Sequence, residues 1–238
     1  MKIALLGFGK MGKRIAEIAT HQGHEVIVKI NSGHGSIDFR DAEVAIDFST
    51  PEVAPILIKK ALLAGLPVVS GTTGWLEKFE EITQICNTNK GTLLYASNFS
   101  LGVNVFFKLN EYLAQMMGRF KSYNIELTEI HHIEKKDAPS GTALSLAQDI
   151  CASTKYSNWT LDSKKQTDST MLVKALREGA VPGTHLVEYK SETDTIYLKH
   201  EAHSRDGFAQ GALIAAAWVL DKKGIYSMQD VLDKPINL

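Results

Sequence analysis

Short apolar runs alternate with helical patterns through the first hundred residues of the chain. The apolar runs fall at residues 2–6, 24–30, 43–48, 67–70 and 92–96. Helices are predicted between them, after the glycines at 7–12, from 49–51 to 64, and at 75–89. Strands and helices that alternate in this way form a parallel sheet with helices on both faces. The pattern therefore predicts an α/β fold that begins with a Rossmann-like, doubly wound parallel sheet.

After residue 102 the pattern changes to a group of strands with two helices. The helices are predicted at 103–117 and 142–150. Strands are predicted from β-branched content and alternation at 123–130, 171–177, 183–190 and 194–200. The polar segment 153–169 reads as a loop or a short excursion of the chain. These elements predict an α+β domain with a mixed sheet, and a sheet with one apolar face and no pair of helices to cover it would pack against another subunit.

Composition excludes several classes of partner. The chain has 238 residues, a formal net charge of −1 and two cysteines. A charge so close to zero gives no general attraction to nucleic acid or to a membrane surface, so neither is expected as a partner. Cys86 and Cys151 are far apart and read as reduced thiols, and the first apolar run is too short for a signal peptide. We therefore expect a cytoplasmic protein.

The segment Gly7-Phe8-Gly9-Lys10-Met11-Gly12 joins the first predicted strand to the first predicted helix. This is the G-x-G-x-x-G spacing in the setting that dinucleotide binding requires. The first glycine allows the tight turn, the second lets a pyrophosphate approach the backbone, and the third lets helix and strand pack closely. All six residues are candidate cofactor contacts. The alternative is a tight glycine turn that binds nothing.

The end of the second predicted strand bears on the choice between NADH and NADPH. Units that bind NAD often place an acidic residue there, which bonds the ribose hydroxyls. The residues here are Lys29-Ile30-Asn31-Ser32-Gly33-His34, without an acid. Asn31 or Ser32 can bond a ribose hydroxyl, and Lys29 or His34 can meet a 2′-phosphate. Both cofactors therefore remain open.

Small residues follow the fourth predicted strand, in the order Gly71-Thr72-Thr73-Gly74. Ligands of open parallel sheets lie beyond the carboxyl ends of the strands, where small residues let a ring or a phosphate come close. The segment is therefore a candidate cofactor contact. The alternative is a plain β-turn before the next helix.

The densest set of titratable side chains lies in residues 126–143, between a predicted strand and a predicted helix. The set consists of His131, His132, Lys135, Lys136 and Asp137. Ser140 is placed to cap the following helix, whose first amides would face an anion. His131 and Lys135 can act as proton donors, while the helix N-terminus and the lysines receive a carboxylate.

Other interpretations of this stretch are weaker. Two adjacent histidines can be structural, and two adjacent lysines are usually part of a solvated face. A metal site is not predicted, because the cysteines are distant and adjacent histidines project in different directions. The combination of these groups at one strand-to-helix junction favours a functional site.

The stretch from Glu129 to Ala143 reads Glu-Ile-His-His-Ile-Glu-Lys-Lys-Asp-Ala-Pro-Ser-Gly-Thr-Ala. It closely resembles the signature of the 4-hydroxy-tetrahydrodipicolinate reductase family, also called dihydrodipicolinate reductases, which serve the diaminopimelate and lysine pathway. Residues 177–185 resemble the Arg-x-Gly and Gly-x-His elements of that family. Residues 200–212 resemble its His-x-Ala-x-Ser-Arg-x-x-Phe-Ala-x-Gly-Ala element, so the resemblance spans nearly the whole chain.

The resemblance implies transfer of a hydride from NADH or NADPH to a cyclic imine-type dicarboxylate, with loss of water. His131 then corresponds to the general acid/base and Lys135 to the proton donor. His132 corresponds to a substrate contact, and Gly141 and Thr142 to the groups that bind a substrate carboxylate. Two segments would lie against the nicotinamide: Gly71, Thr72 and Thr73, and then Ala96, Ser97, Asn98 and Phe99.

The resemblance and the patterns together predict two domains. An Ala-rich helix predicted from residue 206 to Leu220 has side chains small enough to pack tightly on the nucleotide sheet, so it would return the chain to the first domain. We expect a dinucleotide-binding domain of residues 1–102 and 206–238. Residues 103–205 would form a substrate-binding and tetramerisation domain, because the family is typically a homotetramer built on the mixed sheet.

Two other classes of protein share parts of this pattern. A different two-domain NAD(P) oxidoreductase, such as a sugar or semialdehyde dehydrogenase, would carry a catalytic cysteine in a substrate loop or a lysine in a Glu-Lys-Pro setting. Neither feature is seen. A cofactor-sensing protein without turnover would keep the glycine turn but lack the pair His131 and Lys135.

Overall fold

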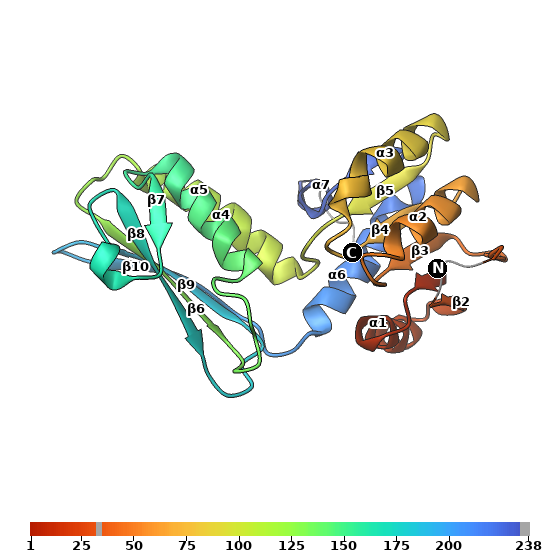
Figure 1. Cartoon of the computed structure of the whole chain (residues 1–238), viewed down its shortest axis with the longest axis horizontal. Helices are drawn as coiled ribbons and strands as arrows, with labels where there is room; N and C mark the ends of the chain where they lie inside the picture. The colour runs from red at the N-terminus through yellow and green to blue at the C-terminus, as the bar shows by residue number, and fades with distance from the viewer. Residues whose placement is uncertain (32–34, 234–238) are drawn as a thin grey trace. The chain divides into compact units, whose positions relative to one another are not determined.

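The computed structural model describes residues 1–31 and 35–233 and contains two compact units (Figure 1). The first unit consists of Met1–Leu101 and Asp206–Leu238, and the second of Gly102–Arg205. Residues 234–238, expected in the first domain, lie outside the described residues. Each unit has its own sheet and its own hydrophobic packing.

Six parallel strands form the sheet of the first unit. They are β1 Lys2–Leu6, β2 Glu25–Ile30, β3 Val44–Asp47, β4 Val68–Ser70, β5 Thr92–Tyr95 and β11 Gly224–Tyr226. Their order across the sheet is β11-β5-β4-β3-β1-β2, and each neighbouring pair is parallel. The predicted parallel sheet is confirmed. The sequence pattern does not reveal β11, because it begins with Gly224, a residue type depleted in strands, and continues for only two more residues.

Helices cover both faces of this sheet, as predicted. They are α1 Lys10–His21, α2 Ala54–Leu63, α3 Phe79–Thr88, α6 Asp206–Trp218 and α7 Met228–Leu232, with a short 3-10 helix at Val219–Asp221. Leu5 of β1 packs with residues of α1, α6 and α7, whereas Leu6 packs with residues of α2 and α3. Successive side chains of a strand point to opposite faces, so a strand covered on both sides is apolar throughout.

Small residues bring α6 close to the sheet. A Cβ placed on Gly211 would lie 1.7 Å from the carbonyl oxygen of Phe99, and Ala209 and Ala212 are fully buried. The close packing expected of this Ala-rich helix is confirmed.

Two helices of the first unit begin later than the pattern predicts. The helix expected from residues 49–51 begins at Ala54, because residues 51–53 form a turn. The helix expected from Trp75 begins as a 3-10 turn, Leu76–Lys78, and becomes α-helical at Phe79. In both places the loop after a strand is longer than expected, which leaves more backbone free at the sheet edge.

The second unit contains a mixed sheet of five strands, as predicted. They are β6 Asn124–His131, β7 Asn158–Thr160, β8 Thr170–Arg177, β9 Thr184–Lys190 and β10 Thr195–Glu201. Their order is β10-β9-β6-β8-β7, with β6 parallel to β8 and antiparallel to β9. The segment 153–169, expected to be a loop or a short excursion, contains β7 and a 3-10 helix at Ser163–Lys165. Strand β7 begins with Asn158, another residue type depleted in strands, so the pattern does not indicate it.

The expectation that no pair of helices covers this sheet is wrong. Helices α4 Leu101–Met117 and α5 Gly141–Ser153 lie along one face (Figure 1). Phe106 of α4 and Leu146 of α5 are buried with Leu127 of β6 in one core. The apolar stripes predict both helices, but a stripe does not indicate which surface it will cover. The opposite face of the sheet is left open, and it carries the exposed side chains of Leu176 and Tyr197.

Candidate active site

The glycine turn of the first unit lies at the carboxyl end of β1, beside the point where the strand order reverses. Gly7 has a φ of 95°, and a Cβ on it would lie 2.3 Å from the carbonyl oxygen of Phe48. A Cβ on Gly12 would lie 2.1 Å from the carbonyl oxygen of Gly7. Both glycines are therefore required by the packing of the turn itself.

Gly9 differs from these two glycines, because a Cβ on it would meet no atom within 4 Å. It is the N-cap of α1 and provides no side chain to cap the first amides of the helix. Lys10 is exposed and Met11 is partly buried against the core. An open backbone at a helix N-terminus fits a pyrophosphate, so the residues present suit the dinucleotide that the sequence predicts.

Asn31 follows β2 and braces the turn. Its Oδ1 accepts a hydrogen bond from the amide of Phe8 at 2.7 Å. Lys29 of β2 places its Nζ 4.6 Å from the centre of the Phe8 ring, a cation–π contact. The side-chain NH₂ of Asn31 is the part that can face a ribose. Ser32 and His34, the other residues expected near the ribose, lie outside the described residues.

A buried carboxylate joins the ends of β3 and β4. Asp47 is 0% exposed and accepts hydrogen bonds from the hydroxyls of Ser49 at 2.6 Å and Ser70 at 2.7 Å. Burial raises the pKa of Asp47, and these hydroxyl donors oppose the change. Thr72 accepts a hydrogen bond from the amide of Ser49 at 2.8 Å, so the predicted Gly71–Thr73 segment is held in place.

The remaining cofactor candidates differ in what they expose. Thr73 and Ser97 are exposed, and Ala96 is partly buried. Asn98 accepts a hydrogen bond from the amide of Ser100 at 2.9 Å. The side chain of Phe99 is 1% exposed and packs edge-on against Phe48 in the core. Phe99 can therefore offer only its backbone to a cofactor.

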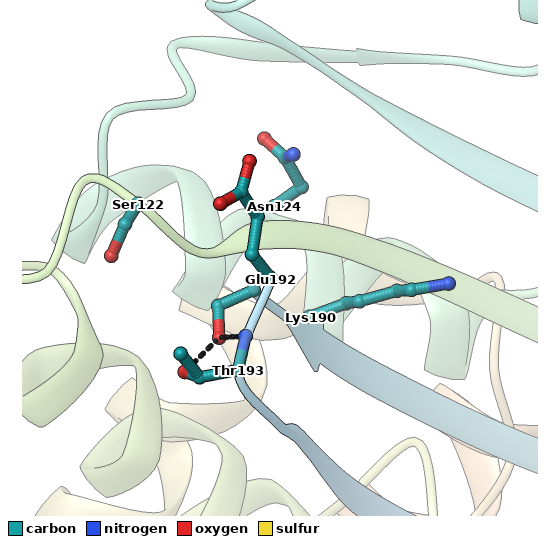
Figure 2. A pocket seen from close by; sticks show the side chains of 6 residues that line it. Ser122, Asn124, Lys190, Glu192 and Thr193 are labelled. Atoms are coloured by element: carbon teal, nitrogen blue, oxygen red, sulfur yellow. Dashed lines mark hydrogen bonds between the residues drawn. The ribbon is translucent and has the colours of Figure 1, made fainter.

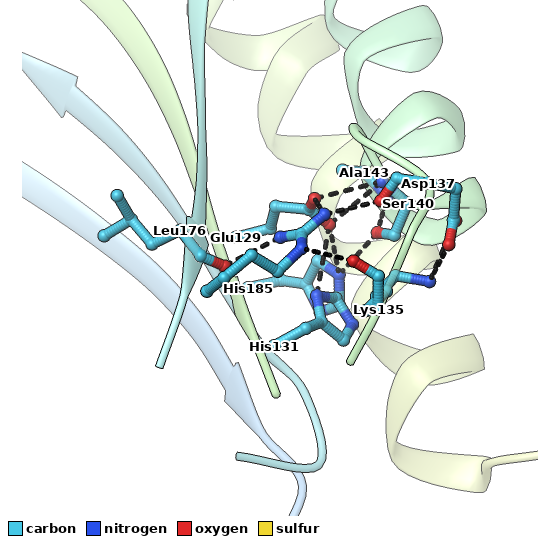
Figure 3. Close-up of polar contacts among 9 residues, drawn as sticks. Glu129, His131, Lys135, Asp137, Ser140, Ala143, Leu176 and His185 are labelled. Carbon is cyan, nitrogen blue, oxygen red and sulfur yellow. Dashed lines mark hydrogen bonds and ion pairs between the residues drawn. The ribbon is translucent and has the colours of Figure 1, made fainter. Parts of the chain in front are cut away.

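Glu129 lies at the centre of the polar cluster in the second unit (Figure 3). It precedes His131 by two positions on β6, so both side chains point to the face covered by α4 and α5. The carboxylate is 0% exposed, and both of its oxygens accept from the amide of Ser140 at 3.1 Å. Its Oε2 lies 3.3 Å from Nδ1 of His131, at ion-pair distance but without the alignment of a hydrogen bond.

Arg177, the last residue of β8, connects the loop that follows β6 to this cluster. Its Nη2 lies 3.2 Å from Oε1 of Glu129 and donates to the carbonyl of Asp137 at 2.5 Å. Its Nε donates to the carbonyl of Lys135 at 3.2 Å. The guanidinium therefore balances the buried carboxylate and fixes the backbone that carries Lys135.

Two histidine rings meet beside Glu129. Burial lowers the pKa of His131, and the cations Lys135 and Arg177 act in the same direction, while the carboxylates Glu129 and Asp137 oppose it. His185 of β9 contacts His131 edge to face, with ring centroids 5.2 Å apart. Burial lowers the pKa of His185 to about 3, so this ring is neutral at physiological pH.

Lys135 and His132 lie in the loop after β6. Nζ of Lys135 donates to both carboxylate oxygens of Asp137 at 2.8 Å, which lowers the pKa of that carboxyl. The Lys135 side chain is 20% exposed. His132 is partly buried, and its Nδ1 has no hydrogen-bond partner within the described chain.

The N-terminus of α5 presents the last two predicted substrate residues. Ser140 caps the helix by accepting a hydrogen bond from the amide of Ala143 at 3.2 Å. Gly141 is exposed, and a Cβ on it would meet no atom within 4 Å. Thr142 is partly buried. The first amides of a helix carry partial positive charge, so this end of α5 suits a carboxylate.

Glu129, His131 and His185 also form a set of groups of the kind that bind metals. Each offers one ligand atom, and these atoms lie within 4.8 Å of one another. The carboxylate of Glu129 already accepts from Arg177 and from the amide of Ser140. A second cation beside the guanidinium would be repelled, so we interpret the cluster as a network of ion pairs and hydrogen bonds.

Glu129 has no role predicted from the sequence, although alternation along the strand places its side chain on the same face as His131. Arg177 and His185 are noticed only through the family resemblance. Arg177 is 48 residues beyond Glu129, and His185 is 45 residues beyond Ser140. Only the pairing of β6 with β8 and β9 brings these side chains together, and no local pattern reveals that pairing.

Two hollows of the described chain lie away from these groups. One, of about 570 Å³, is at the end of β6 opposite His131 (Figure 2). It is lined by Ser122, Asn124, Lys190, Ser191, Glu192 and Thr193. The other, of about 680 Å³, lies between α2 and α3 and includes the exposed Ile56 and Leu63. Neither lining includes a residue of the predicted site.

Comparison with known proteins identifies the family. The model for the N-terminus of dihydrodipicolinate reductase matches residues 1–99, and the model for its C-terminus matches residues 102–232. The 4-hydroxy-tetrahydrodipicolinate reductase of Christiangramia forsetii is 46% identical, over 98% of this chain and 98% of its own. The protein of the same name from Rickettsia bellii is 36% identical, over 96% of this chain and 93% of its own.

A solved structure has the same fold. It is that of dipicolinate-bound dihydrodipicolinate reductase from Paenisporosarcina sp. TG-14, with a TM-score of 0.78 and 22% identity over 98% of this chain and 99% of that chain. In the described part of this chain, no helix combines the length and the apolarity needed to cross a membrane.

The fold and the matches define an oxidoreductase that combines a parallel-sheet unit with a mixed-sheet unit. The chain belongs to the dihydrodipicolinate reductase family, which confirms the resemblance seen at residues 129–143. It is an enzyme of lysine and diaminopimelate biosynthesis with 4-hydroxy-tetrahydrodipicolinate reductase activity.

Proposed function

We propose that the first unit binds NADH or NADPH and that the second unit binds the small dicarboxylate substrate, which is reduced with loss of water. The observation that carries the proposal is the cluster at the end of β6, which combines proton-exchanging groups with a helix N-terminus suited to an anion. The reaction consumes one hydride and one proton. When bound, the reduced nicotinamide supplies the hydride. The chain supplies the proton and holds the charges of the substrate.

On the cofactor side, Gly7, Phe8, Gly9, Lys10, Met11 and Gly12 would hold the pyrophosphate. The open backbone at Gly9 supports this assignment. Asn31 would donate its NH₂ to a ribose oxygen, because its carbonyl oxygen already braces Phe8. The nicotinamide would be bordered by Gly71, Thr72 and Thr73 and by Ala96, Ser97, Asn98 and Phe99, the last through its backbone.

On the substrate side, Lys135 would deliver the proton and His131 would act as general acid/base. Burial lowers the pKa of His131, which favours the neutral ring, and a neutral ring has a free nitrogen that can accept a proton. Gly141 and Thr142 would bind one substrate carboxylate at the start of α5, and His132 would contact the substrate from the loop. A dianion requires fixed cations and amides of this kind.

A coupled assay tests this proposal. The condensation product of pyruvate and aspartate semialdehyde is generated in place, and oxidation of NADH and of NADPH is followed by absorbance in separate reactions. Rapid oxidation with either cofactor supports the assignment, and the ratio of the two kcat/KM values gives the cofactor preference. A protein that binds both cofactors and oxidises neither would refute it.

Replacing Lys135 with alanine should lower kcat by about 10²–10⁴-fold, since a proton donor is lost. The fold should be unaffected, because the partner of Lys135 in the structure is the exposed carboxylate of Asp137. The measurement is kcat/KM together with thermal unfolding. Lys164→Ala, which alters an exposed lysine in the 3-10 helix at Ser163–Lys165, is the control. An unchanged kcat/KM in Lys135→Ala would remove Lys135 from catalysis.

We also propose a homotetramer that buries the open face of the mixed sheet. This face carries Leu176, 40% exposed, and Tyr197, 61% exposed. Large apolar side chains on an uncovered sheet face suggest subunit packing. Light scattering of the native protein should give the mass of four chains, and Leu176→Lys should reduce it. A native protein with the mass of one chain contradicts the proposal.

A further inference from the structure

One buried carboxylate touches both parts of the proposed substrate site. Oε2 of Glu129 lies 3.3 Å from Nδ1 of His131, the proposed acid/base. The same carboxylate accepts from the amide of Ser140, the residue before Gly141 at the start of α5. Because Glu129 is 0% exposed, protein groups alone set its position (Figure 3).

Charged and titratable groups surround this carboxylate on every side. Arg177 of β8 lies 3.2 Å from Oε1, and His185 of β9 lies 3.8 Å from Oε2. His185 also places its Nε2 3.2 Å from Oγ of Ser140, and it pairs in register with His200 of β10. Lys135 and Asp137 complete the set from the loop. The positive guanidinium of Arg177 lies directly against the carboxylate, while the neutral His185 adds no charge.

The two nitrogens of the His131 ring have different surroundings. Nδ1 is buried and faces the Glu129 carboxylate. An N–H at that nitrogen is attracted to the carboxylate, whereas a lone pair is repelled. Nε2 lies beside Gly183, and a Cβ built on this glycine would lie 3.1 Å from Nε2. The absence of a side chain at Gly183 leaves space next to the second nitrogen.

We infer that Glu129 is a positioning residue, which holds His131 with its proton on Nδ1 and leaves Nε2 to exchange protons with the substrate. Through the amide of Ser140, Glu129 also keeps the ring in a fixed position relative to the carboxylate-binding end of α5. The inference rests on the proposed role of His131 as acid/base.

Glu129→Gln is the decisive variant, because it keeps the shape of the side chain and removes the charge. The amide oxygen of glutamine would serve Arg177 and Ser140, which now bond Oε1. Its NH₂ group would then face Nδ1 of His131 and require a lone pair there. The proton of the neutral ring would move from Nδ1 to Nε2. Nε2 would then carry a proton already and could not accept one from the substrate.

We expect Glu129→Gln to lower kcat by at least about 10-fold, taking the lower end of the range for groups that orient metal-binding histidines. The affinity for NADPH, measured by calorimetry, should be unchanged. Glu192→Gln makes the same chemical change in the hairpin between β9 and β10, at the opposite end of the sheet, and should keep the wild-type rate. The loss of rate should nearly vanish when His131→Gln is already present, since a residue that acts through His131 has no effect without it.

Nitrogen-15 NMR of histidine-labelled protein provides a readout that does not depend on activity. The signal of His131 is assigned by its absence in His131→Gln. We expect Nδ1–H for neutral His131 in the wild type, Nε2–H in Glu129→Gln, and a lower pKa of the ring in that variant, because a neighbouring negative charge is lost.

Three results would overturn the inference. One is an Nε2–H tautomer of His131 in the wild type. The second is a Glu129→Gln variant with wild-type rate and tautomer. The third is a loss of rate that is equally large with and without His131→Gln. A normal rate in His131→Gln alone would instead refute the acid–base role, and the NMR spectra would still decide whether Glu129 sets the tautomer.

Discussion

Replacing His131 with alanine should lower kcat by about 10²–10⁴-fold, the range for the loss of a general acid–base group. The ring lies at the end of β6, and its burial lowers its pKa below the usual value. Alanine removes the only atoms of residue 131 that can exchange a proton. The measurement is kcat and KM in the coupled assay, with the affinity for cofactor as a second readout.

His21→Ala is the control for this variant. His21 is exposed in the last turn of α1, so its loss should leave kcat unchanged. Since the glycine turn belongs to the other unit, His131→Ala should bind NADPH as tightly as the wild type. A near-wild-type kcat in His131→Ala would show that His131 is not needed for catalysis. Lys135 would then be the remaining candidate for proton transfer.

The first sheet could be predicted because β1, β3, β4 and β5 are largely buried on both faces and therefore read as apolar runs. Strand β11 could not, since its three residues pair with β5 only after the chain has passed through the second unit. The covering of the mixed sheet was mispredicted for a related reason. The stripes of α4 and α5 indicate apolar faces, but the choice of the sheet as their partner depends on tertiary packing.

The local part of the candidate site was visible in the sequence because one short stretch carries it. His131, Lys135 and Ser140 lie within ten positions, between a strand and a helix start. The groups that brace them were not visible. Arg177 and His185 reach Glu129 through strand pairing, and the hydrogen bond from Phe8 to Asn31 crosses from one strand end to the next. Long-range contacts of this kind leave no periodicity in the chain.

Replacing Gly9 with valine should abolish cofactor binding while leaving the fold intact. The reason is the contrast among the glycines of the turn. A Cβ on Gly7 or Gly12 would collide with backbone at 2.3 Å or 2.1 Å, but a Cβ on Gly9 would meet nothing within 4 Å. The protein itself therefore does not require glycine at position 9, whereas a pyrophosphate approaching the N-terminus of α1 does.

Calorimetry with NADH and with NADPH measures the first part of this prediction, and thermal unfolding measures the second. Gly9→Val should show no binding of either cofactor and an unfolding temperature close to that of the wild type. Gly12→Val is the contrasting variant, because its side chain would force α1 away from the turn and should lower the unfolding temperature as well. If Gly9→Val binds cofactor with unchanged affinity, the pyrophosphate does not lie over this turn, and the cofactor assignments for residues 7–12 fail together.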